Sequence, residues 1–167
     1  MKTVYIVRHA KSSWEFPLLP DEERPLLEKG KRRTMKIVEF LRREKIKVDH
    51  LICSHAVRAM ETAKILADGL DYPKDEIRID PMVYSTDGEG LFNEFYDLPD
   101  KASSVMIIGH NPAVTDFVNN FLDPRIDNLP TSGIISVSFR TDRWEDVSNS
   151  EFIVNFIIFP KIISPND

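Results

Sequence analysis

Three short strand-like runs are each followed by a predicted helix, the first after a long loop, and this pattern limits the chain to few architectures. The runs are Thr3–Val7, Val48–Cys53 and Val105–Ile108. Short runs rich in β-branched residues are typical of buried strands, and their alternation with helices indicates a parallel sheet covered by helices. The carboxyl ends of parallel strands meet at one edge, where α/β proteins bind their ligands. The residues that follow the three runs are therefore the first candidates for a functional site.

The other predicted elements fit the same α/β class. Helical patterns cover roughly residues 29–45, 56–68, 91–98 and 113–121, with Pro112 at the first position of the last helix. A short strand is predicted at 77–79, and alternating runs at 134–139 and 152–159 predict a hairpin. Residues 11–27 contain three prolines, so a long loop is predicted there, and Ser164–Asp167 are expected to fray.

Length and composition exclude several classes of protein. The 167 residues suit a single domain over 1–167, and the lone cysteine, Cys53, is expected in the core and cannot form an internal disulfide. A net charge of −5 argues against a general binder of nucleic acid or of a membrane surface. The apolar run before Arg8 is too short for a signal peptide, and no stretch could span a bilayer. We therefore expect a cytoplasmic protein, of an oligomeric state that the sequence leaves open.

Cations and imidazoles follow the predicted strands. Arg8 and His9 come directly after the first run, Arg58 lies in the first turn of the helix after the second, and His110 follows the third. A guanidinium is a forked donor for phosphate oxygens, and an imidazole can be a nucleophile or carry a proton near neutral pH. Together with the N-termini of helices, these four side chains would form a pocket suited to a phosphoryl group.

These residues resemble the motifs of the histidine phosphatase superfamily, which has the phosphoglycerate-mutase-like fold. The matching segments are Arg8–Ala10, Ser54–Ala63 and Gly109–Pro112, and the segments Arg8–Trp14 and Arg24–Gly30 resemble its SixA-type phosphohistidine phosphatase branch. The resemblance covers roughly residues 3–160, and the three motifs in this order are highly specific. It implies a three-layer α/β/α domain with a mostly parallel central sheet, and no metal or other cofactor.

The resemblance also implies roles for individual residues. His9 corresponds to the nucleophile that becomes a phosphohistidine, Arg8 and Arg58 to the clamp on the phosphoryl oxygens, and His110 to the second histidine at the transferring group. Such a cluster can stabilise charge on the equatorial oxygens, and covalent capture divides the hydrolysis into two displacements. The attacking nitrogen must be unprotonated, so we expect the other ring nitrogen to bond to a backbone carbonyl.

The chain departs from the family pattern at two places. His55 stands where the family commonly has proline, and a structural role is the favoured interpretation for it. Relatives that hydrolyse phosphate esters carry an acidic proton donor after the third strand, and the candidates here are Asp87, Glu89 and Glu94. None stands in a recognisable donor motif, and plain loop polarity is favoured for Asp87 and Glu89. A phosphohistidine substrate accounts for a missing donor, because a protonated imidazole leaves as a neutral ring.

Three more residues lie near the proposed nucleophile in the sequence. Arg24 either adds a third cation to the phosphate pocket or closes a salt bridge within the loop. Lys11 and Trp14 are candidates to line its entrance, and Trp14 either contacts a protein substrate or anchors the loop.

Three functions follow, of which the first is preferred. It is a metal-independent phosphatase that removes phosphate from phosphohistidine, with a histidine-phosphorylated protein as the candidate partner. The alternatives are a small-molecule phosphate ester phosphatase with an acidic donor and a phosphate- or phosphoprotein-binding module without turnover. The paired nucleophile argues against the binding module. A mutase is disfavoured because the short segment 80–104 offers little lid.

Overall fold

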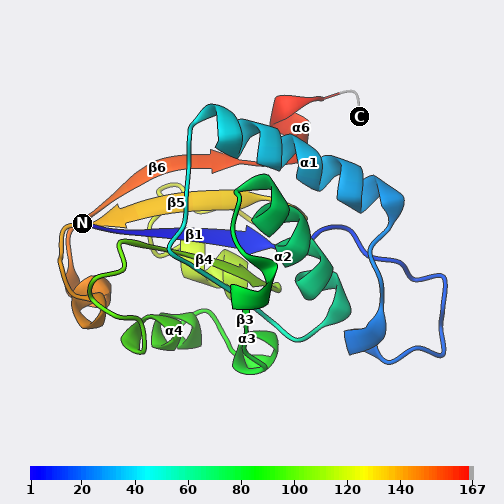
Figure 1. Cartoon of the computed structure of the whole chain (residues 1–167), viewed down its shortest axis with the longest axis horizontal. Coiled ribbons are helices and arrows are strands. Elements are labelled where there is room, and N and C mark those ends of the chain that lie inside the picture. Colours follow the sequence, from blue (N-terminus) through cyan, green and yellow to red (C-terminus); the bar gives the residue numbers. More distant parts are fainter. Residues whose placement is uncertain (166–167) are drawn as a thin grey trace.

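A six-stranded sheet with the order β3-β2-β4-β1-β5-β6 forms the centre of the computed structural model, which describes residues 1–165 (Figure 1). The strands are β1 Lys2–Arg8, β2 His50–Cys53, β3 Arg78–Ile79, β4 Ser104–Gly109, β5 Ile134–Phe139 and β6 Phe152–Ile158. The first four pair in parallel, whereas β5 pairs antiparallel with both β1 and β6. The sheet is therefore mixed and mostly parallel, and the predicted hairpin is confirmed. The prediction that the last residues fray includes Asn166 and Asp167, which lie outside the described residues.

Helices cover both faces of the sheet and complete the predicted three layers. The helices are α1 Glu28–Arg43, α2 Val57–Gly69, α3 Met82–Ser85, α4 Asn93–Tyr96, α5 Ala113–Val118 and α6 Pro160–Ile163. Side chains from α1 and α2 form one apolar cluster with the sheet, and side chains from α3, α4 and α5 form a second. Within residues 1–165, no helix is long and apolar enough to cross a membrane.

The central strands β1 and β4 are buried on both faces, which explains why their sequences are continuous apolar runs. In β1, Val4 and Ile6 enter the cluster with α5, while Tyr5 and Val7 enter the cluster with α1 and α2. Alternate residues of β4 divide between the two clusters in the same way. A strand buried on both faces needs apolar residues at every position. Cys53, at the end of β2, is buried as predicted, and burial raises the pKa of its thiol to about 12.

Two predicted helices differ from the structure. The helix predicted at 91–98 is a 3-10 turn at Gly90–Phe92 followed by α4, because the Asp87 carboxylate accepts the Gly90 N–H and begins a tight turn. The helix predicted at 113–121 ends at Val118, because the Asn119 side chain bonds to the backbone of Ile126. Pro112 precedes this helix instead of occupying its first position.

The segment 11–27 is a long loop, as predicted, with one 3-10 turn at Asp21–Glu23. Its two arms are joined at the base, where Ser12 forms a bridge with Leu26 and the Leu27 N–H donates to the Lys11 carbonyl at 2.9 Å. A Cβ at Gly30 would lie 2.4 Å from the same carbonyl, so a side chain there would force this base apart. In Figure 1 the loop extends beyond the carboxyl end of β1.

Candidate active site

One cavity lies at the carboxyl ends of β1, β4 and β2, which are neighbours in the sheet. Its volume is about 370 Å³, and its lining residues include the four predicted ones, Arg8, His9, Arg58 and His110. The remaining lining residues are Lys11, Ser12, Trp14, Arg24, Asn111 and Thr131. Because the three strands run in parallel, side chains that are far apart in the sequence meet at this edge.

His9 is held in one orientation at the start of the loop. Its Nδ1 lies 2.7 Å from the carbonyl oxygen of Ala10, which can only accept a hydrogen bond, so Nδ1 carries the proton and Nε2 is unprotonated. A backbone carbonyl is the partner that we expected for an unprotonated nucleophile. Burial and the charges of Arg58, Arg8 and Arg24 lower the pKa of His9 to about 4, although the bond to Ala10 acts in the opposite direction. The ring is therefore neutral at pH 7, with a free lone pair on Nε2.

His110 lies against His9, with 5.1 Å between the ring centroids. Its Nε2 is 2.8 Å from the hydroxyl of Ser54, and the Ala56 N–H donates to the same hydroxyl at 3.0 Å. Burial and the neighbouring His9 and Arg58 lower the pKa of His110 to about 3. Ser54, which the sequence identified only as a helix cap or turn residue, thus fixes the second histidine. Its position at a strand end was the only signal for this contact.

Three buried nitrogen atoms of the cavity have no hydrogen-bond partner among the described residues. They are Nε of Arg8, Nε of Arg58 and Nδ1 of His110. A buried polar group without a partner costs about 1–3 kcal/mol, so such groups are rare and concentrate where a ligand completes the site. The two Nε–H groups can only donate, which makes this an environment for an oxygen-rich anion.

Outer nitrogens of both arginines, one in Arg8 and both in Arg58, are already bound by the protein. Arg8 Nη1 donates to the carbonyl of Leu129 at 3.0 Å. Arg58 donates through Nη1 to the Asp21 carbonyl at 2.7 Å and through Nη2 to the Asp21 carboxylate at 2.8 Å. Each guanidinium is therefore held through its outer nitrogens, while its Nε–H has no hydrogen-bond partner among the described residues.

Asp21 is the main residue of the site that the sequence did not reveal. Its carboxylate accepts hydrogen bonds from Arg58, from Arg24 Nε at 3.1 Å and from the Tyr84 hydroxyl at 2.7 Å. Burial acts to raise the pKa of Asp21, but the bonds from Tyr84 and Arg58 hold it well below its usual range. Arg24 pairs with Asp21, so the predicted salt bridge within the loop is present; Arg24 also lines the cavity, and its role as a third cation for the phosphoryl group stays a prediction.

We expect Asp21→Asn to lower kcat/KM about tenfold, because one charge-assisted hydrogen bond to Arg58 or Arg24 is lost and the guanidinium gains freedom. Steady-state kinetics on a phosphorylated substrate measures this change. The matched control is Glu23→Gln, which removes the same charge two residues away in the same turn. An equal loss in both variants would mean that general charge, and not the contact with Arg58, is responsible.

The predicted acidic donors do not line the cavity of His9. Asp87 and Glu89 line a separate cavity of about 880 Å³ together with Asp116, and Asp87 is engaged in the turn at Gly90. Glu94 is buried and pairs with Arg78 at 3.0 Å. Burial and the adjacent Asp80 raise the pKa of Glu94 to about 7. The position of these three carboxyl groups gives no support to a donor role at His9.

Lys11, Trp14 and His55 also have definite positions. Lys11 and Trp14 line the cavity, and the guanidinium carbon of Arg24 lies 3.7 Å from the centroid of the Trp14 ring. His55 does not line it; its ring packs against Tyr84 at 5.0 Å, in agreement with a structural role.

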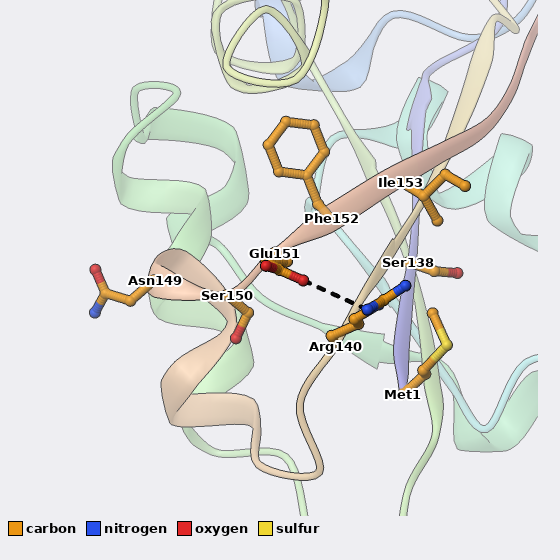
Figure 2. A pocket seen from close by; sticks show the side chains of 8 residues that line it. All are labelled: Met1, Ser138, Arg140, Asn149, Ser150, Glu151, Phe152 and Ile153. Atoms are coloured by element: carbon orange, nitrogen blue, oxygen red, sulfur yellow. Dashed lines mark ion pairs between the residues drawn. The ribbon is translucent and has the colours of Figure 1, made fainter.

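A second cavity lies at the opposite end of β1, and Figure 2 shows the residues around it. Its volume is about 730 Å³, and it contains an ion pair between Arg140 and Glu151 at 3.6 Å. No histidine is among the described residues that line it, and phosphoryl transfer through an imidazole requires one as the nucleophile. Across residues 1–165, no group of three or more His, Cys, Asp or Glu side chains could hold a metal ion.

Comparison with known proteins gives a consistent result. The family model described as histidine phosphatase superfamily (branch 1) matches residues 4–82. The chain is 28% identical over 151 residues to the uncharacterized protein ML1117 of Mycobacterium leprae, covering 83% of this chain and 90% of that protein. It is 31% identical over 119 residues to the uncharacterized chloroplastic protein At3g52155 of Arabidopsis thaliana, covering 66% of this chain and 54% of that protein.

Structural comparison shows the same fold in SixA proteins. The protein histidine phosphatase SixA complexed with tungstate has a TM-score of 0.80 and 22% identity, over 97% of this chain and 99% of that one. SixA from Nakamurella multipartitia has a TM-score of 0.79 and 21% identity, over 95% and 96% of the two chains. The phosphoglycerate-mutase-like α/β fold expected from the motifs is therefore confirmed.

Proposed function

Because this chain belongs to branch 1 of the histidine phosphatase superfamily, we propose that it is a metal-independent phosphatase whose nucleophile is His9. The observation that carries the proposal is the geometry around that ring. A neutral imidazole with a free Nε2 shares one cavity with the unpaired Nε–H groups of Arg8 and Arg58. A module that only bound phosphate would need the donors but not the nucleophile.

The reaction proceeds in two displacements. In the first, His9 Nε2 attacks phosphorus, a P–N bond forms, and the bond from phosphorus to the leaving group breaks. In the second, water attacks the phosphohistidine, inorganic phosphate leaves, and His9 regains its lone pair. Arg8, Arg58 and His110 donate to the equatorial oxygens, whose negative charge they stabilise in both transition states. The tungstate complex of SixA supports a tetrahedral oxyanion as the ligand of this fold.

Phosphohistidine is the proposed substrate, in the form of a phosphorylated protein. An alkoxide leaving group needs a proton from an acid, and no Asp or Glu is among the described residues that line the cavity. A protonated imidazole leaves as a neutral ring, so a P–N bond can break without that acid. The similarity to SixA structures supports the same substrate class.

We expect the protein to hydrolyse phosphoramidate and a histidine-phosphorylated protein at least about 100-fold more efficiently than alkyl phosphates, whose alkoxide leaving group needs a proton, since general acid catalysis contributes about this much or more. Phosphate release with EDTA present measures the preference. A preference for an ester would move the assignment to a small-molecule phosphatase, and Asp87→Asn with Glu89→Gln would then test for the donor. Phosphate binding without any release would identify a binding module.

A further inference from the structure

The loop beside the proposed active site exposes four large apolar side chains. Trp14 is 77% exposed, Phe16 49%, Leu18 97% and Leu19 37%, and we refer to these four as the apolar loop tip. Single exposed apolar residues are common, but exposed apolar side chains at four of the six consecutive positions 14–19 favour a surface that contacts another molecule.

The base of the loop holds the tip away from the core. The Ser13 N–H donates to the Pro25 carbonyl at 2.8 Å, and Arg24 Nη1 donates to the Ser12 hydroxyl at 2.8 Å. Ser12, Ser13 and Arg24 are buried, whereas every residue from Trp14 to Pro20 is exposed. The apolar side chains therefore lie at the end of a loop whose base is held by hydrogen bonds. Figure 1 shows this loop projecting from the body of the protein.

The apolar loop tip is continuous with the cavity of His9. Trp14 lines that cavity, but Phe16, Leu18 and Leu19 do not. A small phosphate compound held in the cavity would therefore leave those three side chains in water. A folded protein that delivers its phosphorylated histidine to His9 has a surface around that histidine, and this surface would cover the tip as well.

The lining of the same cavity is positively charged. Lys11 lines it together with Arg8, Arg24 and Arg58, and no Asp or Glu is among the described lining residues. In a chain with a net charge of −5, positive charge is therefore concentrated beside the site. This distribution suits a partner with an acidic surface.

We propose that the apolar loop tip is a docking surface for a folded, acidic protein that carries the phosphohistidine substrate. The inference rests on the proposed function and adds the recognition element. The tip supplies apolar contact area, Lys11 at the cavity attracts acidic side chains, and the cavity receives only the phosphoryl group and its ring. Affinity for a protein substrate then depends on side chains that take no part in the chemistry.

The test is the double variant Phe16→Ser with Leu18→Ser, assayed on three probes. The probes are phosphoramidate, a folded acidic protein with one surface phosphohistidine, and a short phosphohistidine peptide from the same surface. We expect KM for the folded protein to rise about tenfold or more, with kcat little changed, because interface side chains of this kind contribute about this much. Activity on phosphoramidate and on the peptide should stay at the wild-type level.

Ile153→Ser is the matched control. Ile153 is 58% exposed and lies at the second cavity, at the other end of the sheet (Figure 2). An unchanged KM for the folded protein in the loop variant would overturn the docking surface, as would an equal change in the Ile153 variant. If the wild-type protein released no phosphate from any of the three probes, the proposed function itself would fail, and the two results are therefore distinguishable.

Discussion

His9→Ala is expected to lower kcat by at least about 10⁴-fold, because loss of a covalent nucleophile removes both displacements and leaves only the binding of the phosphoryl group. The ring is buried and held by Ala10, so no neighbouring nitrogen can take its place with the same geometry. The other imidazole in the cavity, His110, is fixed through its Nε2 by Ser54. The measurement is phosphate release from a histidine-phosphorylated protein at saturating substrate, together with thermal unfolding of the variant.

The control for this variant is His50→Ala. His50 is the first residue of β2, at the opposite end of that strand from the cavity, and it does not line the cavity. We expect its variant to keep wild-type kcat. A His9→Ala protein that folds normally and still turns over within about tenfold of wild type would exclude His9 as the nucleophile.

Arg58→Ala is expected to lower kcat/KM about 10²–10³-fold, since a fixed donor to the developing charge on phosphorus is worth about this much. Two effects combine here. The unpaired Nε–H is lost, and the Asp21 carboxylate loses one of its arginine partners, so its negative charge is less neutralised beside the phosphate. We expect Arg58→Lys to recover little activity, because an ammonium group cannot bind Asp21 and also present a second donor in a fixed plane.

Arg140→Ala provides the comparison for Arg58. Arg140 is also paired with a carboxylate, that of Glu151, but it lies at the second cavity. Its variant should have wild-type kcat/KM. If Arg58→Lys were fully active, the contribution of Arg58 would be its charge alone, and the assigned role of its Nε–H would be wrong.

The parts of the structure that could be predicted depend on simple periodic signals. The strands β1, β2 and β4 are recognisable because burial on both faces requires apolar residues at consecutive positions. Once these strands are parallel neighbours, Arg8, His9, Arg58 and His110 must lie near one edge. The tautomer of His9 could be anticipated as well, because an unprotonated nucleophile requires a bond at the other nitrogen.

The parts that could not be predicted depend on contacts between distant residues without a motif. Asp21 lies in an irregular loop and meets Arg58 and Tyr84, which are 37 and 63 positions further along the chain. No periodic pattern in the sequence links the carboxylate of Asp21 to side chains on the two separate helices α2 and α3. The acidic candidates Asp87, Glu89 and Glu94 were nominated by chemistry and sequence position alone, and the fold directs them to other partners.

The most direct test of the proposed nucleophile is to identify the phosphorylated atom of the enzyme itself. The protein would be mixed for milliseconds with a substrate protein carrying radioactive phosphohistidine, quenched in alkali, digested and mapped. Because Nδ1 of His9 is bound to the Ala10 carbonyl, we predict that the label lies on His9 at Nε2, and that His9→Ala takes up none. Label on Nδ1 of His9, label on His110, or turnover without any labelled enzyme would contradict the mechanism.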